Sequence, residues 1–136
     1  MSTRRRRSIR VDGLGHGQPI PNACRIGDLI WSGGINGADP DTGLISENLS
    51  DEVAQMFANL ETIVRAADAT DDDIIRLSVY SRDREVTSSL NEAWIATFPD
   101  EASRPARHLS IQEIHPALRI QCEFVAVASP ADVDQP

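Results

Sequence analysis

The feature that most constrains the fold is an amphipathic pattern between residues 50 and 67. Ser50 can cap the start of a helix, and Asp51 and Glu52 would then lie at the positive end of its dipole. A helix with one apolar face needs an apolar surface to cover, so the pattern predicts a sheet elsewhere in the chain. The apolar residues recur at spacings of three and four: Val53, Met56, Phe57, Leu60, Ile63, Val64 and Ala67.

Strand patterns on both sides of this helix supply that sheet. Residues 22–25 and 28–35 predict a hairpin, because Gly27 separates two short apolar runs. Residues 74–82 alternate, which predicts a half-buried strand with Ile75, Leu77 and Val79 facing inward. Two further strands are expected at the end of the chain, at about 107–113 and 118–128.

A second helix is expected between these strands. Asp83 can cap it, and Val86, Leu90, Trp94 and Phe98 form its buried stripe. The predicted order is β-β-α-β-α-β-β, which is typical of an α+β sandwich, a mixed sheet with two helices on one face. The other face keeps apolar side chains such as Val125 and Val127, so we expect a homo-oligomer.

A chain of 136 residues predicts one domain. We expect residues 1–18 to form a flexible, Arg-rich segment, residues 19–129 the domain, and residues 130–136 a flexible tail. Thirteen basic residues are all Arg, five of them in the first ten positions, and the absence of Lys excludes Schiff-base and P-loop lysine chemistry.

The charge balance argues against nucleic acid as the main partner. Without the first ten residues, 8 basic residues face 21 acidic ones, and a body near −13 repels phosphate backbones. No apolar stretch is long enough to span a bilayer, and no export signal is seen. Cys24 and Cys122 are then expected to be reduced core thiols in a cytoplasmic protein.

Histidines and aspartates do not form metal-binding patterns. His16, His108 and His115 lack zinc spacing, and residues 71–73 are an Asp run without a twelve-residue calcium loop. Gly13 to Gly17 resemble a dinucleotide loop only superficially, since no strand is predicted before them and no helix after them. We therefore expect neither a metal nor a cofactor.

Three polar residues on the last two predicted strands are candidates for a site. Arg107 shares a strand side with Leu109, so its guanidinium either reaches the rim or sits in a partly dry pocket as a carboxylate clamp. Gln121 and Glu123 lie on a strand side that turns apolar further along. They suit the wall of a cleft between subunits, or a strand end that reaches solvent.

The motifs taken together resemble the RidA/YjgF/UK114 family of small imine and enamine deaminases, over residues 19–129. The resemblance implies a chorismate-mutase-like fold and a trimer with a cleft at each subunit boundary. The motifs that carry it are Ile26-Gly27-Asp28-Leu29-Ile30-Trp31-Ser32-Gly33-Gly34, Pro40-Asp41-Thr42-Gly43, Asn59-Leu60, Asp73-Ile74-Ile75, Val79-Tyr80, Asp83, Leu90-Asn91-Glu92-Ala93-Trp94, Arg104-Pro105-Ala106-Arg107 and Glu123-Phe124-Val125-Ala126-Val127.

The resemblance also implies a reaction and a site. In this family the Arg matched by Arg107 grips the carboxylate of a 2-imino or 2-enamino acid, and backbone groups matched by Gly33 and Gly34 help to bind it. A glutamate on the last strand positions the attacking water, and the products are a 2-keto acid and ammonia. Further substrate-binding positions would be Ile20, Asn91 and Leu109.

The chain departs from the family pattern at several of these positions. The water-positioning glutamate is replaced by Gln121, so that Glu123 is the acidic residue left nearby. Ile20 replaces a tyrosine, Leu109 a cysteine or threonine, and Gly33 a serine. These changes favour a divergent subgroup that acts on a bulkier or less polar substrate, such as an aminomuconate-like or pathway-specific enamine.

Two other functions remain open at this point. Because Gln121 cannot take a proton at neutral pH, the same cleft could bind or sense small carboxylates without catalysis. Ribonuclease activity, reported for some relatives, conflicts with the acidic body.

Overall fold

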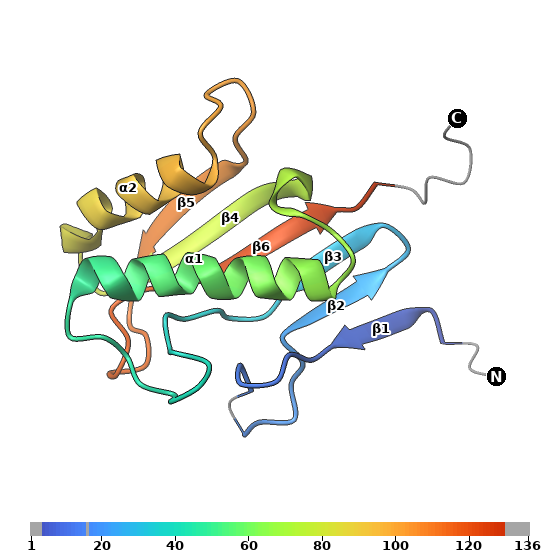
Figure 1. Cartoon of the computed structure of the whole chain (residues 1–136), viewed down its shortest axis with the longest axis horizontal. Helices are drawn as coiled ribbons and strands as arrows, with labels where there is room; N and C mark the ends of the chain where they lie inside the picture. The colour runs from blue at the N-terminus through green and yellow to red at the C-terminus, as the bar shows by residue number, and fades with distance from the viewer. Residues whose placement is uncertain (1–3, 16, 130–136) are drawn as a thin grey trace.

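Two helices, α1 (Leu49–Ala66) and α2 (Thr87–Thr97), cover one face of a six-stranded sheet (Figure 1). The computed structural model describes residues 4–15 and 17–129. The strand order is β1-β2-β3-β6-β4-β5; β4 and β5 run parallel and the other neighbours antiparallel, so the predicted α+β fold with a mixed sheet is confirmed. The strands are β1 (Arg6–Ile9), β2 (Ala23–Ile26), β3 (Leu29–Ser32), β4 (Ile74–Ser81), β5 (Ala106–Ile111) and β6 (Gln121–Val127).

Helix α1 begins two residues earlier than its sequence pattern suggests. Asn48 is the N-cap, and its side-chain oxygen accepts a hydrogen bond from the Asp51 N–H at 3.1 Å. Ser50 lies inside the helix, and its hydroxyl meets that of Ser89 on α2 at 3.1 Å. Asn and Ser cap equally well, so composition alone does not decide between the two positions. The predicted apolar stripe is buried against the sheet.

Strand β1 corrects the expectation of a flexible segment for residues 6–9, which lie within the expected range 1–18. Ile9 is buried and pairs with Ala23 of β2, and the Asn22 N–H donates to the Ile9 carbonyl at 2.8 Å. Arg7 forms an ion pair with Asp68 at the end of α1. A short edge strand with a single buried apolar residue shows no periodicity, so the sequence pattern does not predict it.

The glycine-rich segment from Gly13 therefore does follow a strand, although no helix comes after it. The expectations for residues 1–3, His16 and the tail 130–136 lie outside the described residues.

Strand β4 differs from simple alternation at its start. A β-bulge lies between Ile74 and Arg76, and it turns Ile75 outward, 59% exposed, instead of inward as predicted. Helix α2 is preceded by a 3-10 turn, Arg84–Val86, which Asp83 caps by accepting from the Glu85 N–H.

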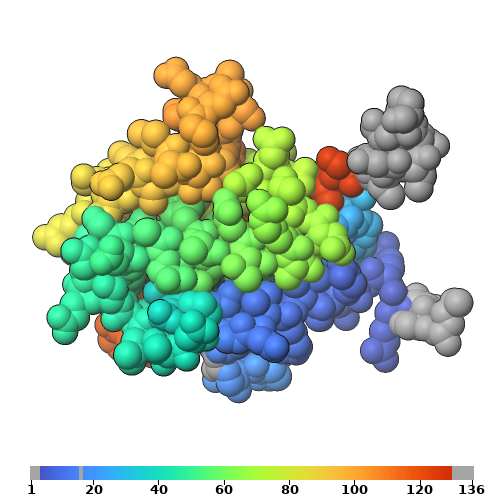
Figure 2. All heavy atoms as spheres, viewed as in Figure 1, coloured from blue at the N-terminus to red at the C-terminus, as the bar shows by residue number. Residues whose placement is uncertain are grey.

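The two faces of the sheet have different surroundings. Seen from the helix side, the side chains of α1, α2 and the segment before β2 leave little of the strands in view (Figure 2). Under them lie the inward residues of β6, all fully buried, including Cys122, Phe124 and Ala126. On the open face, large apolar side chains are exposed to solvent in the single chain, among them Leu29 (46%), Trp31 (58%) and Val127 (49%).

Candidate functional site

Arg107 lies on the helix side of the edge strand β5. It pairs with Leu77, which is fully buried under the helices, so the two side chains point to the same face. Helix α2 places Asn91 and Trp94 above it, three residues apart on one side of the helix. The guanidinium stacks 4.9 Å from the centre of the Trp94 ring, and Nη2 donates a hydrogen bond of 2.8 Å to the Asn91 side-chain oxygen.

The charge of Arg107 is only partly satisfied. Nη1 is buried and has no hydrogen-bond partner among the described residues. Burial lowers the pKa of Arg107 from its ordinary value, which still leaves it cationic at neutral pH. A buried donor without a partner costs the fold about 1–3 kcal/mol, and an anion that accepts from it would remove that cost.

The surface in front of Arg107 forms an open hollow of about 400 Å³. Its walls are Asn91, Trp94, Ile95, Arg104 and Arg107. Volumes of this order accommodate small organic ligands. Leu109, two residues further along β5 on the same face, packs against the buried core instead of lining the hollow. We call this surface the Arg107 hollow.

Gln121 and Glu123 lie on the opposite, open face of the sheet. Gln121 pairs with Tyr80, and Glu123 pairs with Ser78. The Tyr80 hydroxyl donates to Glu123 Oε1 at 2.6 Å, and this bond, with some desolvation, raises the pKa of Tyr80. One oxygen of the Glu123 carboxylate is therefore already engaged within the chain.

Gly33 and Gly34 follow β3 and lie beside Gln121. The Gly33 N–H donates to the Asn22 carbonyl at 2.9 Å, and its carbonyl accepts from the Ser32 hydroxyl, so the Gly33 N–H is not available to a ligand. At Gly34 a Cβ atom would overlap the Gln121 side-chain nitrogen, so only glycine lets that amide lie on the backbone. Ile20, half exposed, lies in the connection between β1 and β2.

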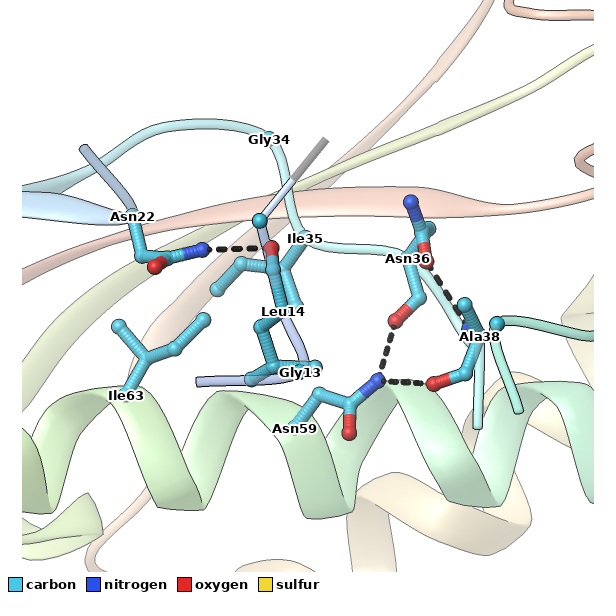
Figure 3. A pocket seen from close by; sticks show the side chains of 11 residues that line it. Gly13, Leu14, Asn22, Gly34, Ile35, Asn36, Ala38, Asn59 and Ile63 are labelled. Atoms are coloured by element: carbon cyan, nitrogen blue, oxygen red, sulfur yellow. Dashed lines mark hydrogen bonds between the residues drawn. The ribbon is translucent and has the colours of Figure 1, made fainter. Parts of the chain in front are cut away.

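A second hollow of about 230 Å³ lies behind Gly34, against α1 (Figure 3). Its polar side chains are occupied by the chain itself. Asn59 donates to the carbonyls of Asn36 and Ala38, and Asn22 donates to that of Leu14 (Figure 3). These bonds tie the segments before β2 and after β3 to the fold, so we assign this hollow to the support of Gly34 and not to a ligand.

The predicted site residues thus fall into two groups in the single chain. Arg107 and Asn91 lie at the β5 edge on the helix face, and Gln121 and Glu123 lie on the open face. Gly34 follows β3, which is three strand positions from β5, roughly 14 Å at the usual strand spacing. No single protomer can close all of them around one small ligand.

Two side chains that contact the predicted site residues, Trp94 and Tyr80, are not assigned to the site by the sequence analysis. Trp94 is expected in the buried stripe of its helix, yet its ring also supports Arg107; the spacing of Asn91 and Trp94 is the available signal. Tyr80 and Glu123 both face outward on their strands, but only the sheet register shows that they meet.

Metal and membrane features can be stated for the described residues. No group of three or more His, Cys, Asp or Glu side chains there is arranged to hold a metal ion. None of the helices in the described ranges has both the length and the apolar character that a bilayer crossing requires. Cys24 and Cys122 are free thiols, and burial raises the pKa of Cys122 far above its ordinary value.

Comparison with known proteins finds one matching family model and several relatives of similar sequence. A family model described as Endoribonuclease L-PSP matches residues 18–128. A RutC family protein of Aquifex aeolicus is 27% identical over 110 residues, which covers 80% of this chain and 88% of that protein. A 2-iminobutanoate/2-iminopropanoate deaminase of Salmonella typhimurium is 27% identical over 111 residues, covering 80% and 87%.

Solved structures agree on the fold. The crystal structure of Escherichia coli TdcF with bound serine has a TM-score of 0.82 at 23% identity, covering 90% of this chain and 99% of that one. A protein of Rhodopseudomonas palustris described as a probable translation initiation inhibitor has a TM-score of 0.84 at 22% identity, covering 92% and 99%. At these identities the likeness concerns the fold alone.

Proposed function

The chain belongs to the Endoribonuclease L-PSP family, which includes the RidA and TdcF proteins, and on this premise we propose that it hydrolyses 2-imino or 2-enamino acids. Reactive intermediate deaminases are among its relatives, at about a quarter identity, so a hydrolytic deaminase is the activity that the family supports in general. The observation that carries the proposal for this chain is Arg107, a desolvated guanidinium with an unpartnered donor beside an open hollow.

The substrate carboxylate binds Arg107 in the hollow. A small turn of the guanidinium presents Nη1 to the carboxylate, while Asn91 and the Trp94 ring keep the group in place. Charge-assisted, forked hydrogen bonds of this kind fix the orientation of a carboxylate as well as its position. TdcF was crystallised with serine, whose carboxylate is the same chemical group.

The reaction needs only an oriented imine and a placed water. A 2-enamino acid first tautomerises to its imine. Water adds to the imine carbon and one of its protons moves to the nitrogen, which gives a carbinolamine. The remaining hydroxyl proton moves to the nitrogen as the C–N bond breaks, which releases ammonia and leaves the 2-keto acid. Such imines also hydrolyse unaided, so orientation and water placement are sufficient to accelerate them. No covalent intermediate is required, which is compatible with a chain that has no Lys.

We assign the water to Gln121 in preference to Glu123. The Gln121 amide lies on the backbone at Gly34, whereas Glu123 already accepts from Tyr80. An amide can both donate to and accept from a water molecule, but it cannot take its proton at neutral pH. The proton therefore passes from the water to the imine nitrogen, which becomes more basic as the water adds.

We further propose that the site is shared between protomers of a homotrimer. Within one chain, Arg107 lies on the other face of the sheet from Gln121 and three strand positions from Gly34. On the open face Leu29, Trp31 and Val127 are exposed. Burying this face against copies of itself would bring the sheet edges of different protomers together. Arg107 would then face the partner subunit's Gly34 and Gln121.

The kinetic test uses an imine made in the cuvette. An amino acid oxidase converts alanine or 2-aminobutanoate to its imine, and semicarbazide competes with the protein for that imine. The wild-type protein should suppress semicarbazone formation, and Arg107→Ala should not. Arg84→Ala, an exposed arginine on the turn before α2, is the matched control and should behave as wild type. Equal curves with and without wild-type protein for every imine tried would end the deaminase proposal.

Subunit complementation tests the shared site. Arg107→Ala and Gly34→Val should each be inactive, because each damages one side of the cleft. Unfolding an equimolar mixture and refolding it together should restore about a quarter of wild-type activity, since both sides are intact at one interface in four. Each variant refolded alone is the control. No recovery from mixed assemblies, verified by a mass tag, would place the whole site in one protomer.

A non-catalytic carboxylate-binding protein is the second candidate function, and Gln121 is the observation that favours it. It predicts that small 2-keto acids raise the melting temperature in an Arg107-dependent way while no imine is turned over. Ribonuclease activity is disfavoured by the formal charge of −8 and by the balance after the first ten residues, where 8 basic residues face 21 acidic ones.

A further inference from the structure

Arginines that are partly buried fall into two pairs in the described residues. Arg25 contacts Asp28, and Arg119 contacts Glu52, so both have carboxylate partners. Arg104 and Arg107 are also partly buried, yet no described carboxylate is in salt-bridge contact with either. These two line the same hollow. A pair of guanidinium groups without counter-ions in one hollow is an unusual concentration of positive charge for a protein of net charge −8.

Arg104 is held in a defined position. It precedes β5 in the loop that stands out from the body in Figure 1, and its Nε donates to the Phe98 carbonyl at 2.8 Å at the end of α2. A weaker contact of 3.5 Å joins Nη2 to the Pro99 carbonyl. Nη1 has no recorded acceptor among the described residues. The anchor leaves one end of the guanidinium free to bind an anion.

The surface between the two arginines is apolar. Trp94 lies under Arg107, and Ile95, 54% exposed, forms the adjoining wall. A ligand that spans the hollow would therefore place methylene or vinyl carbons on these side chains and charged groups at both ends.

We propose that the preferred substrate is dicarboxylic: a 2-imino or 2-enamino acid whose first carboxylate binds Arg107 and whose distal carboxylate binds Arg104. The proposal rests on the proposed function, since Arg107 is taken to hold the carboxylate next to the reacting carbon. A second carboxylate on the substrate would also account for the second arginine in the hollow. An acidic body repels a dianion at long range, so two local cations are needed to hold it.

Acidic residues near Arg104 form no ion pair with it among the described residues. Asp71, Asp72 and Asp100 line a separate hollow of about 290 Å³ that Arg104 also borders, and none is in salt-bridge contact with it. They would repel an anion from that hollow and so favour the Arg107 hollow for the distal carboxylate.

Binding of stable keto acids tests the preference without relying on turnover. Titration calorimetry should show that 2-oxoglutarate binds at least tenfold more tightly than 2-oxobutanoate. Arg104→Gln should abolish this difference by weakening the binding of 2-oxoglutarate far more than that of 2-oxobutanoate. Arg104→Lys should retain part of the preference, and Arg84→Gln all of it. Equal affinities for the two acids in wild type, or a preference that survives in Arg104→Gln, would overturn the inference.

Turnover separates this inference from the proposed function. Imines made from alanine and from glutamate by their oxidases are compared with the same four proteins. Acceleration of both imines without a preference for the glutamate-derived one, together with equal keto-acid binding, removes the dicarboxylate proposal and keeps the deaminase. Arg104-dependent preference in binding with no acceleration of either imine removes the deaminase and keeps the dicarboxylate site.

Discussion

Arg107 and Arg119 are two partly buried arginines in opposite situations. Arg119 Nε donates to Glu52 Oε1 at 2.6 Å, its backbone N–H donates to the other oxygen of that carboxylate, and its Nη atoms donate to the carbonyls of Ser46 and Glu47. Arg107 has one hydrogen bond, to Asn91, and a buried nitrogen without a partner. All three nitrogens of the Arg119 guanidinium donate within their own chain, whereas the Arg107 guanidinium has a buried nitrogen without a partner.

The difference between Arg119 and Arg107 shows how hydrogen-bond partners distinguish an arginine with a structural role from one that can bind a ligand. Arg119 joins the start of α1 to the segment before β6, and each of its side-chain nitrogens donates within the chain, so its hydrogen bonds stabilise the fold. Arg107 borders an open hollow and has one hydrogen bond and one ring contact within its own chain. Substitutions at the two positions should therefore have crossed effects, on stability at one and on ligand binding at the other.

The largest effect is expected at Arg119. In Arg119→Met the aliphatic part of the side chain is kept, but the fully buried Glu52 carboxylate loses its cation, which typically costs about 3–5 kcal/mol. Urea unfolding at one fixed protein concentration measures this, since an oligomer's stability depends on concentration. Adding Glu52→Gln should recover much of the loss. A loss below about 1 kcal/mol would mean that the pair is not a structural clamp.

Arg107→Met should give the converse result. We expect kcat/KM for an imine, or the affinity for a keto acid, to fall about 30- to 100-fold, which corresponds to losing charge-assisted hydrogen bonds worth about 2–3 kcal/mol. The melting temperature should stay the same or rise, because an unsatisfied donor is removed. Arg107→Lys should remain well below wild type, since Lys lacks the fork. A marked fall in melting temperature without a change in binding would reverse the assignment.

The sequence predicted the fold well wherever one periodicity was strong. The stripe of α1, the hairpin of β2 and β3 and the inward residues of β6 follow from spacing alone. It failed where tertiary contacts decide. Strand β1 exists because Ile9 pairs with Ala23, and Ile75 turns outward because of a bulge. Neither the short strand nor the bulge produces a periodic pattern that can be recognised within four or five residues.

The site was predictable residue by residue but not as an assembly. Arg107, Asn91, Gly34 and Gln121 were all marked by the family resemblance. That Arg107 and Gln121 point to opposite faces follows from the register of β4 with both neighbours, and register depends on long-range pairing. The contact between Gln121 and Gly34 likewise becomes visible only when β3 and β6 are adjacent.

Gln121→Glu asks whether the open face can supply a base that the present chain lacks. If the water lies at this side chain, an isosteric carboxylate should raise kcat about tenfold, which is less than the roughly 10²–10⁴-fold that an optimally placed general base contributes. The gain should disappear below about pH 4–5, where a Glu becomes protonated. Gln121→Leu should lower kcat by a similar factor. Glu123→Gln is the control: Gln121→Glu adds a carboxylate to the open face and Glu123→Gln removes one. The two variants together show whether the number of carboxylates or their position determines the rate. An unchanged rate in both Gln121 variants would move the water elsewhere.

The smallest effect is expected at Tyr80, where the hydroxyl is satisfied by Glu123 as Arg119 is by Glu52. Tyr80→Phe should reduce the free energy of unfolding by about 1 kcal/mol near pH 8. The bond raises the pKa of Tyr80, so this contribution is fully present below the unfolded pKa, near 10, and is lost as the pH rises through the higher folded value. The difference between wild type and variant should therefore shrink above pH 10.

Tyr80 is the only tyrosine in the chain, so its phenolate absorbance reports this group alone. The titration midpoint should lie above that of free tyrosine in wild type and return toward it in Glu123→Gln. If the Tyr80–Glu123 pair has only a structural role, the pH profile of kcat/KM should be the same in Tyr80→Phe as in wild type. If that profile shifts instead, Glu123 and not Gln121 positions the water, because removing its donor would then alter the reaction and not only the fold.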